Sequence, residues 1–322
     1  MKIVLPFISG NFLNWPGPFL ESVDPSDGTV WSRVARCGSI EADVAVRSAG
    51  QAFRVGDWAQ ADGAGRGDIL DSLADVLETD WEFLVEAEVR DNGKRITEVR
   101  GQFSGLHSWF RHFAGEARKL GIEPQTNAVP GVISANHPQP YGVVVAITPW
   151  NSPLMILAWK MAPALAAGNT MVVKPSEMAS ASTVAFAQMV HEAGLPAGVL
   201  NVVTGLGHEV GEALVRHPLT RKVTFTGSDM AGRKVAEAAS GRVIPTTLEL
   251  GGKSAQVVFA DADMDNAVNG VLSGIFLSNG QTCVAGSRLL VDASIHDAFV
   301  ARIHARAASL RLGNPMDPTT QV

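Results

Sequence analysis

The chain has very few cysteines: Cys37 and Cys283 are the only two among 322 residues. Two cysteines cannot form the disulfide framework of a small secreted protein, so an oxidising compartment is not indicated. Basic residues are also in the minority, with 26 Lys and Arg against 32 Asp and Glu and a formal net charge of −6. A general nucleic-acid binder would need a basic surface, so we expect no nucleic-acid partner.

Long apolar segments are missing as well. No apolar run approaches the roughly 20 residues that a membrane-spanning helix needs. The N-terminal stretch "MKIVLPFISGNFLNWPGPF" has one Lys, and Gly, Asn and Pro soon interrupt its apolar residues, unlike those of a signal peptide. We therefore expect a cytoplasmic protein without membrane contact.

Several catalytic signatures are lacking. The eight histidines are scattered without metal-ligand spacing, so we expect no metal site. The sequence also contains neither G-x-S-x-G nor a Walker A motif. A serine-hydrolase elbow and a P-loop are thereby excluded.

The chain is long enough for about two domains. Residues 1–40 are rich in turn formers and predict short strands and loops, whereas residues 41–120 have apolar positions every three or four residues, which predicts helices. Residues 122–140 are rich in proline and predict a protruding hairpin or connecting ribbon.

A regular alternation begins at residue 141. Apolar strand-like runs such as "YGVVVAITPW" and "NTMVVKPSE" are separated by helical segments such as "LMILAWKMAPALAAG". Strands without internal polar alternation predict a parallel sheet that is covered on both faces. Ligands of such sheets bind at the carboxyl ends of the strands, which here carry "TPWN", "KPSE", "TGLG", "FTGS" and "LELGG".

Each of these strand ends allows a functional and a structural interpretation. Asn151 is either a site residue or a turn residue or N-cap of the following helix. Lys174 and Glu177 suit a phosphate and ribose hydroxyls, or they belong to a solvated loop.

The glycine-rich turns are similarly ambiguous. Gly205, Gly207 and Gly211 do not match G-x-G-x-x-G because the last gap is one residue too long. Gly227 and Ser228 form another strand–helix turn. Backbone amides at such turns favour a phosphate in either case.

Glu249 and Cys283 are the candidates for the chemistry. Glu249 ends an apolar strand, where burial would favour its protonated form and suit a general base, unless it faces solvent. Cys283 follows a segment that predicts a helix ending at Asn279-Gly280. It is either a thiol activated by backbone dipoles or an inert buried residue. We assign Cys37 to packing.

In their order and separations, "TPWNSP", "KPSE", "FTGS", "LELGGKS" and "GQTC" resemble segments of the aldehyde dehydrogenase superfamily. The resemblance covers the whole chain, from "FISGNFLN" and "DPSDGTV" to "LRLGNPMDP". It implies an α/β fold in which residues 1–121 and 141–251 form a Rossmann-type NAD-binding domain. Residues 122–140 would be an oligomerisation ribbon, and residues 252–322 the first part of an α/β catalytic domain.

The same resemblance implies roles for individual residues. Cys283 matches the nucleophile that forms a thiohemiacetal and then a thioester, Asn151 the oxyanion-hole amide, and Glu249 the general base. The positions that match the family's dinucleotide site are Thr148, Pro149, Trp150, Lys174, Ser176, Glu177, Gly207, Gly211, Phe225, Thr226, Gly227, Ser228, Leu250 and Gly251.

The implied activity is oxidation of an aldehyde to a carboxylic acid. An acidic Glu177 would repel a 2′-phosphate, which favours NAD over NADP, and Glu249 favours hydrolytic release of an acid. Members of the family form homodimers or homotetramers. The alternatives are a non-catalytic NAD-binding fragment and a cofactor-independent esterase that uses Cys283.

Two departures from the family pattern stand out. Ser152 occupies a position where many relatives carry a bulky aromatic residue, so we expect a wider substrate entrance. The chain ends at "DPTTQV", before the family's later Glu-x-Phe-Gly segment, and is therefore expected to be a truncated member.

Overall fold

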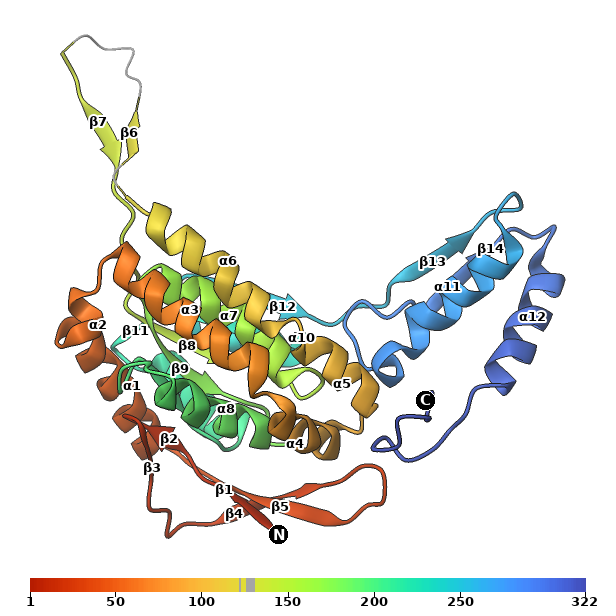
Figure 1. Cartoon of the computed structure of the whole chain (residues 1–322), viewed down its shortest axis with the longest axis horizontal. Helices are drawn as coiled ribbons and strands as arrows, with labels where there is room; N and C mark the ends of the chain where they lie inside the picture. The colour runs from red at the N-terminus through yellow and green to blue at the C-terminus, as the bar shows by residue number, and fades with distance from the viewer. Residues whose placement is uncertain (122, 126–130) are drawn as a thin grey trace.

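The computed structural model describes residues 1–121, 123–125 and 131–322. A seven-stranded sheet with the order β12–β11–β8–β9–β10–β2–β3 lies at its centre (Figure 1). The first five of these strands are parallel to one another, namely Thr246–Leu250, Thr220–Gly227, Val143–Ile147, Thr170–Lys174 and Leu200–Val202. β2 (Phe7–Ile8) and β3 (Asn11–Phe12) extend the sheet in antiparallel pairing. The parallel sheet expected from the strand–helix alternation is confirmed.

Helices cover both faces of the sheet. Successive residues of each strand point to opposite faces, so each strand contributes side chains to two hydrophobic clusters. On β8, Val144 and Ala146 pack with one hydrophobic cluster, and Val143 and Val145 pack with the other. The first cluster contains α3 (Gly63–Thr79), α4 (Glu82–Asn92), α6 (Leu106–Lys119), α7 (Pro153–Ala166) and α8 (Ala181–Glu192). The second contains α1 (Ser39–Arg54), α9 (Glu212–Arg216) and α10 (Asp229–Ser240).

Two smaller strand units flank the sheet. β1 (Lys2–Val4), β5 (Val30–Ala35) and β4 (Phe19–Val23) form a separate three-stranded sheet near the N-terminus. β6 (Glu123–Gln125) and β7 (Ser134–Asn136) pair as an antiparallel hairpin that projects from the body (Figure 1). Residues 122 and 126–130 of the expected ribbon lie outside the described residues.

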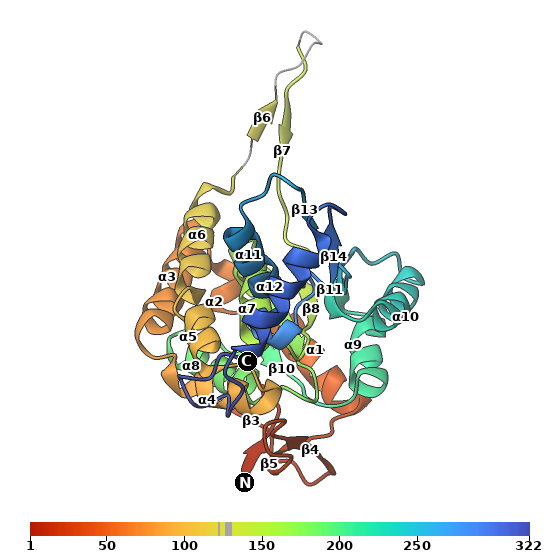
Figure 2. The ribbon, with the colours of Figure 1, turned by 90° about the vertical axis from the view of Figure 1, so that its right-hand side faces the viewer.

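The C-terminal segment packs around its own small core. β13 (Ala255–Val258) and β14 (Arg288–Val291) form a parallel pair, accompanied by α11 (Met264–Phe276) and α12 (His296–Ala308). Their shared core contains Val258, Val268, Val271, Leu272 and Phe299. When the molecule is turned by 90°, α11 and α12 lie in front of the central sheet (Figure 2).

Within the described parts of the chain, no helix combines the length and the hydropathy that crossing a membrane requires. The same residues contain no group of three or more His, Cys, Asp and Glu side chains arranged to hold a metal ion.

A buried carboxyl group joins three elements of the fold. Asp91 near the end of α4 accepts a hydrogen bond from Ser22 Oγ on β4 at 2.8 Å and one from the backbone N–H of Ala181 at the start of α8 at 3.1 Å. Burial raises the pKa of Asp91 to about 7, although these two hydrogen bonds act to lower it. Asp91 therefore ties the N-terminal sheet to the helical layer and holds its proton near neutral pH.

This pKa predicts a specific pH dependence of stability. The unfolded carboxyl has a pKa of 3.8, so between this pH and about pH 7 the folded state holds a proton that the unfolded state has released. The stability that this group contributes therefore falls as the pH rises from about 4 to about 7. We expect the free energy of unfolding of the wild type, minus that of Asp91→Asn, to fall by up to about 1.4 kcal/mol per pH unit between about pH 5 and pH 7. Urea unfolding at several pH values measures this difference. A difference that does not change with pH would contradict the assignment.

Candidate active site

Four neighbouring strands end at the same edge of the central sheet. Thr148 follows β8, Lys174 ends β9, Gly227 ends β11 and Leu250 ends β12. Because these strands are parallel and adjacent, their carboxyl ends lie side by side. The residues singled out in the sequence therefore share one edge, the carboxyl edge.

Cys283 lies on a loop with an unusual backbone. α11 ends at Phe276, three residues before the expected Asn279, and a short 3₁₀ segment η2 (Leu277–Gly280) follows it. Ser278, Asn279 and Gly280 have φ values of 52°, 55° and 74°. Left-handed conformations are costly for residues other than Gly, so the surrounding structure must hold this loop in place.

The loop is held by α5 (Ile96–Phe103) and by the turn that joins α4 to it. The backbone N–H of Ser278 donates to both carboxylate oxygens of Glu98 at 3.1 Å. Asn279 Nδ2 donates to the carbonyl oxygen of Gly93 at 3.0 Å. Both contacts span about 180 residues of sequence, which explains why the sequence did not reveal them.

Asn151 reaches the same loop from the sheet. Its Nδ2 donates a hydrogen bond of 2.6 Å to the carbonyl oxygen of Gln281, two residues before Cys283. The N-cap of α7 is Ser152, so the alternative of Asn151 as an N-cap is wrong. An amide nitrogen carries two hydrogens, so a second N–H of Asn151 remains for another acceptor.

A buried lysine that sequence reasoning missed lies beneath this corner. Lys94 has no exposed side-chain surface, and its Nζ is 3.0 Å from Glu88 Oε1, 2.7 Å from Gln102 Oε1 and 3.2 Å from Ser152 Oγ. The neighbouring Asn92 donates to the carbonyl oxygen of Asn151 at 3.3 Å. The lysine in "DNGK" was the available signal, because a lysine directly after a helix-ending Asn-Gly can turn back onto that helix.

Glu249 does not have the buried position that was expected. β12 is the edge strand of the sheet, and Leu248 and Leu250 point toward the α10 side whereas Glu249 is exposed. Thr247 and Glu249 share one face of β12 and both are exposed, so no other part of the described chain covers this face and the expectation of burial is wrong. A Cβ added at Gly252 would lie 3.0 Å from the carbonyl oxygen of Cys283, so the segment after Glu249 passes directly beside the cysteine.

Lys160 on α7 is a second residue that the sequence analysis missed. Its Nζ donates to Thr224 Oγ1 on β11 at 2.9 Å. Thr224 lies on the same sheet face as Thr226, which pairs with Glu249. Burial lowers the pKa of Lys160 to about 8, the charge of Glu249 opposes this shift, and Lys222 adds to it. A single lysine within the apolar run "LAWKMAP" was the signal that could have identified it.

Lys174 and Glu177 form an ion pair at the end of β9. Their atoms Nζ and Oε2 are 2.8 Å apart, and the Lys174 side chain is 3% exposed, so the alternative of a solvated loop is wrong for Lys174. Burial lowers the pKa of Lys174, and Glu177 opposes this shift. Burial acts to raise the pKa of Glu177, but the charge of Lys174 and its hydrogen bond outweigh burial and lower it. Glu177 is therefore a carboxylate at neutral pH, with 36% of its side chain exposed.

The glycine turns differ in what they require. Gly207 and Gly211 bound a π-helical turn, η1 (Gly207–Gly211), and a Cβ at either would meet nothing within 4 Å. Gly227, in contrast, leaves only 2.6 Å between such a Cβ and the ring of Phe225. Ser228 is the N-cap of α10, and its Oγ accepts from the N–H of Ala231 at 3.3 Å. The first turn thus leaves room for a ligand. The presence of Gly227 and Ser228, in contrast, is explained by packing against Phe225 and by capping of α10.

The other candidate positions line the carboxyl edge. Ser176 and Phe225 are buried, Pro149 and Leu250 are half-buried, and Trp150 and Gly251 are exposed. Thr148 Oγ1 and Thr226 Oγ1 are buried and have no hydrogen-bond partner among the described residues. Unpartnered buried hydroxyls are costly unless a ligand or water satisfies them. Together with the space at Gly207 and Gly211, they fit a polar ligand such as a nucleotide.

The two cysteines lie in opposite environments. Cys283 is exposed, so the alternative of a buried packing residue is wrong for it. Cys37 has no exposed surface, and burial raises its pKa to about 12. Its assignment to packing agrees with this position.

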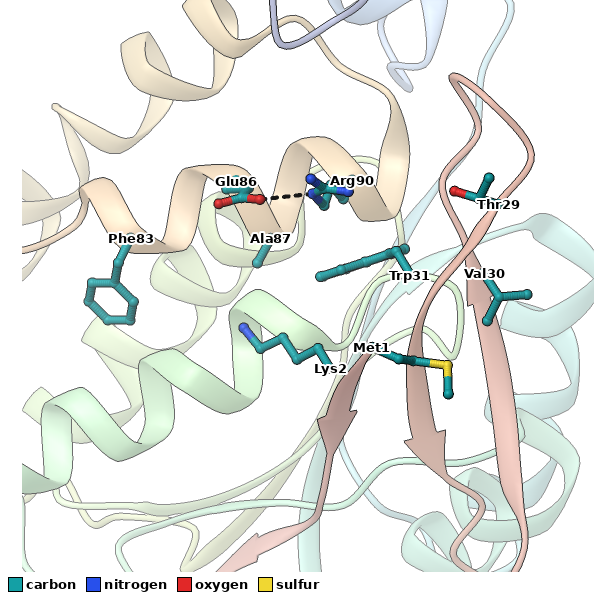
Figure 3. A pocket seen from close by; sticks show the side chains of 9 residues that line it. All are labelled: Met1, Lys2, Thr29, Val30, Trp31, Phe83, Glu86, Ala87 and Arg90. Carbon is teal, nitrogen blue, oxygen red and sulfur yellow. Dashed lines mark hydrogen bonds and ion pairs between the residues drawn. The ribbon is translucent and has the colours of Figure 1, made fainter.

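Cavities accompany the site but do not define it. One of about 430 Å³ lies behind the cysteine loop, where Asn92, Arg95, Asn279 and Gln281 contribute to its lining. Another, of about 470 Å³, lies between the N-terminal sheet and α4, with the ion pair of Arg90 and Glu86 at its wall (Figure 3). None of the candidate site residues lines this second cavity.

Taken together, these features define a doubly wound α/β protein that holds an exposed cysteine beside the carboxyl edge of its sheet. The model of the aldehyde dehydrogenase family matches residues 16–322. The chain belongs to the aldehyde dehydrogenase family, as the resemblance in the sequence indicated.

Individual relatives agree with this assignment. An aldehyde dehydrogenase of Aspergillus niger is 41% identical over 317 residues, which are 98% of this chain and 63% of that protein. PnpE of Pseudomonas sp. WBC-3, solved in complex with nicotinamide adenine dinucleotide, is 41% identical with a TM-score of 0.95 over 99% of this chain and 65% of its own. An NADP-dependent enzyme of E. coli is 33% identical with a TM-score of 0.95 over 100% of this chain and 66% of its own. The chain thus spans less than two thirds of the length of these relatives.

The buried ion pair predicts a large effect of removing Lys94. Lys94→Met leaves the Glu88 carboxylate buried without its cation, which should lower the free energy of unfolding by about 3–5 kcal/mol. Denaturant unfolding measures the loss. Lys119→Met is the matched control, because Lys119 pairs with Glu116 at the surface and should change stability little. Equal effects of the two substitutions would contradict the importance of the buried pair.

The cysteine environments predict a simple thiol count. A disulfide reagent should titrate Cys283 in the folded protein and both cysteines after denaturation, because the thiolate is the reactive form and only Cys283 is accessible. Cys283→Ala should abolish the reaction of the folded protein, and Cys37→Ala should leave it unchanged. Rapid reaction of Cys37 in the folded state would show that its surroundings open readily.

Proposed function

We propose that this chain carries the cofactor site and the nucleophile of an enzyme that oxidises an aldehyde to a carboxylic acid with NAD. One observation carries the proposal: Asn151 at the carboxyl edge donates to Gln281, which places an amide beside the loop of the exposed Cys283. Membership of the aldehyde dehydrogenase family supports it.

Cys283 is the nucleophile in this proposal. Its thiolate attacks the carbonyl carbon of the aldehyde, a C–S bond forms, and the carbonyl oxygen gains the negative charge. The free N–H of Asn151, with the backbone N–H of Cys283, stabilises this oxyanion. The bond from Asn151 to Gln281 fixes the amide before the substrate arrives, so no reorganisation is needed during the reaction.

A bound dinucleotide would supply the acceptor for the hydride that the tetrahedral carbon loses. Cys283 then carries a thioester. Glu249 takes a proton from the water that attacks this thioester, the C–S bond breaks, and the carboxylic acid leaves.

The residues of the carboxyl edge would hold the nucleotide. Lys174 and Glu177 suit the adenosine ribose, and the amides of η1 suit a phosphate. The ionised Glu177 repels a 2′-phosphate, so we propose NAD in preference to NADP. We assign the dinucleotide-binding domain to residues 1–121 and 141–251, and the first part of the catalytic domain to residues 252–322.

The hairpin is proposed as a contact between copies of the chain. β6 and β7 project from the body, and Ile133 beside β7 is 94% exposed. An exposed apolar side chain on a projecting hairpin favours self-association. We further propose that the protein acts in the cytoplasm.

The test separates the acylation step from the hydrolysis step. Glu249→Gln should release about one NADH per chain and then stop, because the thioester forms but its hydrolysis lacks the base. Cys283→Ala should release none. Rapid-mixing measurements of NADH absorbance with NAD and a small aliphatic aldehyde record both results, and Glu237→Gln, an exposed acid on α10, is the control.

Other outcomes would favour the alternatives. NAD binding without NADH from any aldehyde would indicate a non-catalytic fragment. Hydrolysis of an activated ester without NAD that disappears in Cys283→Ala would indicate an esterase. Unchanged turnover of Glu249→Gln would show that the base lies elsewhere.

A further inference from the structure

A buried acid on α5 anchors the loop that leads to Cys283. The Glu98 side chain is 8% exposed, and both of its carboxylate oxygens accept a hydrogen bond from the backbone N–H of Ser278 at 3.1 Å. Arg95 Nη2 also donates to Glu98 Oε1. The carboxylate is therefore held by a guanidinium of its own helix while it binds the loop.

A chain of hydrogen bonds runs from Glu98 to the amide of Asn151. The carbonyl oxygen of Ser278 accepts a hydrogen bond from the backbone N–H of Gln281 at 2.9 Å, which closes a tight turn. The carbonyl oxygen of Gln281 in turn accepts from Asn151 Nδ2 at 2.6 Å. The two ends of one turn are thus each bound by a side chain from outside it, Glu98 at Ser278 and Asn151 at Gln281.

The backbone of this turn does not favour its own conformation. Ser278 and Asn279 have φ values of 52° and 55°, which residues other than Gly rarely adopt. A conformation of this kind persists only where the surrounding contacts enforce it. Without Glu98, the N–H of Ser278 loses its charged acceptor and the turn can relax. The carbonyl of Gln281 then shifts, and the amide of Asn151 loses the partner that orients it.

We propose that Glu98 is a positioning residue, which holds the Asn151 amide in the orientation that stabilises the oxyanion formed at Cys283. This inference rests on the proposed roles of Asn151 and Cys283. Glu98 acts through Ser278 and Gln281 and not on the reacting atoms. Its loss should therefore slow reactions in which a carbonyl oxygen gains negative charge, and it should spare reactions of the same thiol in which none does.

Two reagents separate these kinds of reaction at Cys283. The ester p-nitrophenyl acetate acylates the thiolate: a C–S bond forms, the carbonyl oxygen gains the negative charge, and p-nitrophenolate leaves as the C–O bond breaks. Iodoacetamide alkylates the same thiolate by direct displacement of iodide, and no oxyanion forms. The ratio of the acylation rate constant to the alkylation rate constant cancels changes in the amount of accessible thiolate and retains the effect of the amide.

Rapid-mixing measurements of both reactions test the proposal. Glu98→Ala should lower the ratio about 10- to 100-fold, the range expected when an oriented group near the reacting atoms is misplaced. Glu98→Gln should recover most of this loss, because its amide oxygen can still accept from the N–H of Ser278. Glu82→Ala is the matched control: Glu82 also links α4 to α5, through Arg100, but its side chain is 56% exposed, and the ratio should not change.

The outcomes separate this inference from the proposed function. If the wild type is acylated and Glu98→Ala keeps its ratio, the role of Glu98 is refuted and Cys283 remains the nucleophile. If the wild type is not acylated, the proposed nucleophile fails and the inference fails with it. A Gln variant as impaired as the Ala variant would contradict the hydrogen-bond argument.

A further variant covers the case in which Glu98→Ala does not fold, which reaction of Cys37 with iodoacetamide would reveal. Glu98→Asp keeps the charge beside Arg95 but shortens the side chain by one methylene, so its carboxylate no longer reaches Ser278. The ratio should fall in this variant as well. An unchanged ratio in a folded Glu98→Asp protein would refute the proposal.

Discussion

The ammonium group of Lys94 is the constraint on which the site depends. It lies without water contact among Glu88, Gln102 and Ser152, so the turn after α4 can adopt only the conformation that satisfies it. This turn presents Asn92 to the backbone of Asn151 and the carbonyl of Gly93 to Asn279. Both partners of the site, the amide and the cysteine loop, are thus positioned by a charge that contacts neither the proposed substrate nor the proposed cofactor.

The carboxyl edge combines rigid and open parts. β8 and β9 are buried along their whole length and are therefore held rigidly. The polar residues that directly follow them are positioned by these rigid strands. The turn at Gly207 and Gly211 leaves space, and two threonine hydroxyls elsewhere along the edge, those of Thr148 and Thr226, lack partners within the described chain. Such an edge fits a ligand that fills the open space and forms hydrogen bonds with the unpartnered hydroxyls.

Much of the fold could be predicted from the sequence because its signals are local. The strands of the parallel sheet are continuous apolar runs, since both faces are covered, and the helices between them keep their period. The position of Glu249 could not be predicted, because whether a strand lies at the edge depends on the strand order and not on its own residues. The bonds of Asn151 to Gln281 and of Glu98 to Ser278 join residues 130 and 180 positions apart, and no local pattern encodes them.

The small C-terminal core has a mechanical consequence. The thiol belongs to a unit with its own hydrophobic cluster, whereas the amide and the nucleotide loops belong to the central sheet. The thiol and the amide therefore lie beside each other only while these two separately packed units keep their relative position. A ligand that contacts both units stabilises their relative arrangement. By thermodynamic reciprocity, any change that stabilises this arrangement also raises the affinity for the ligand.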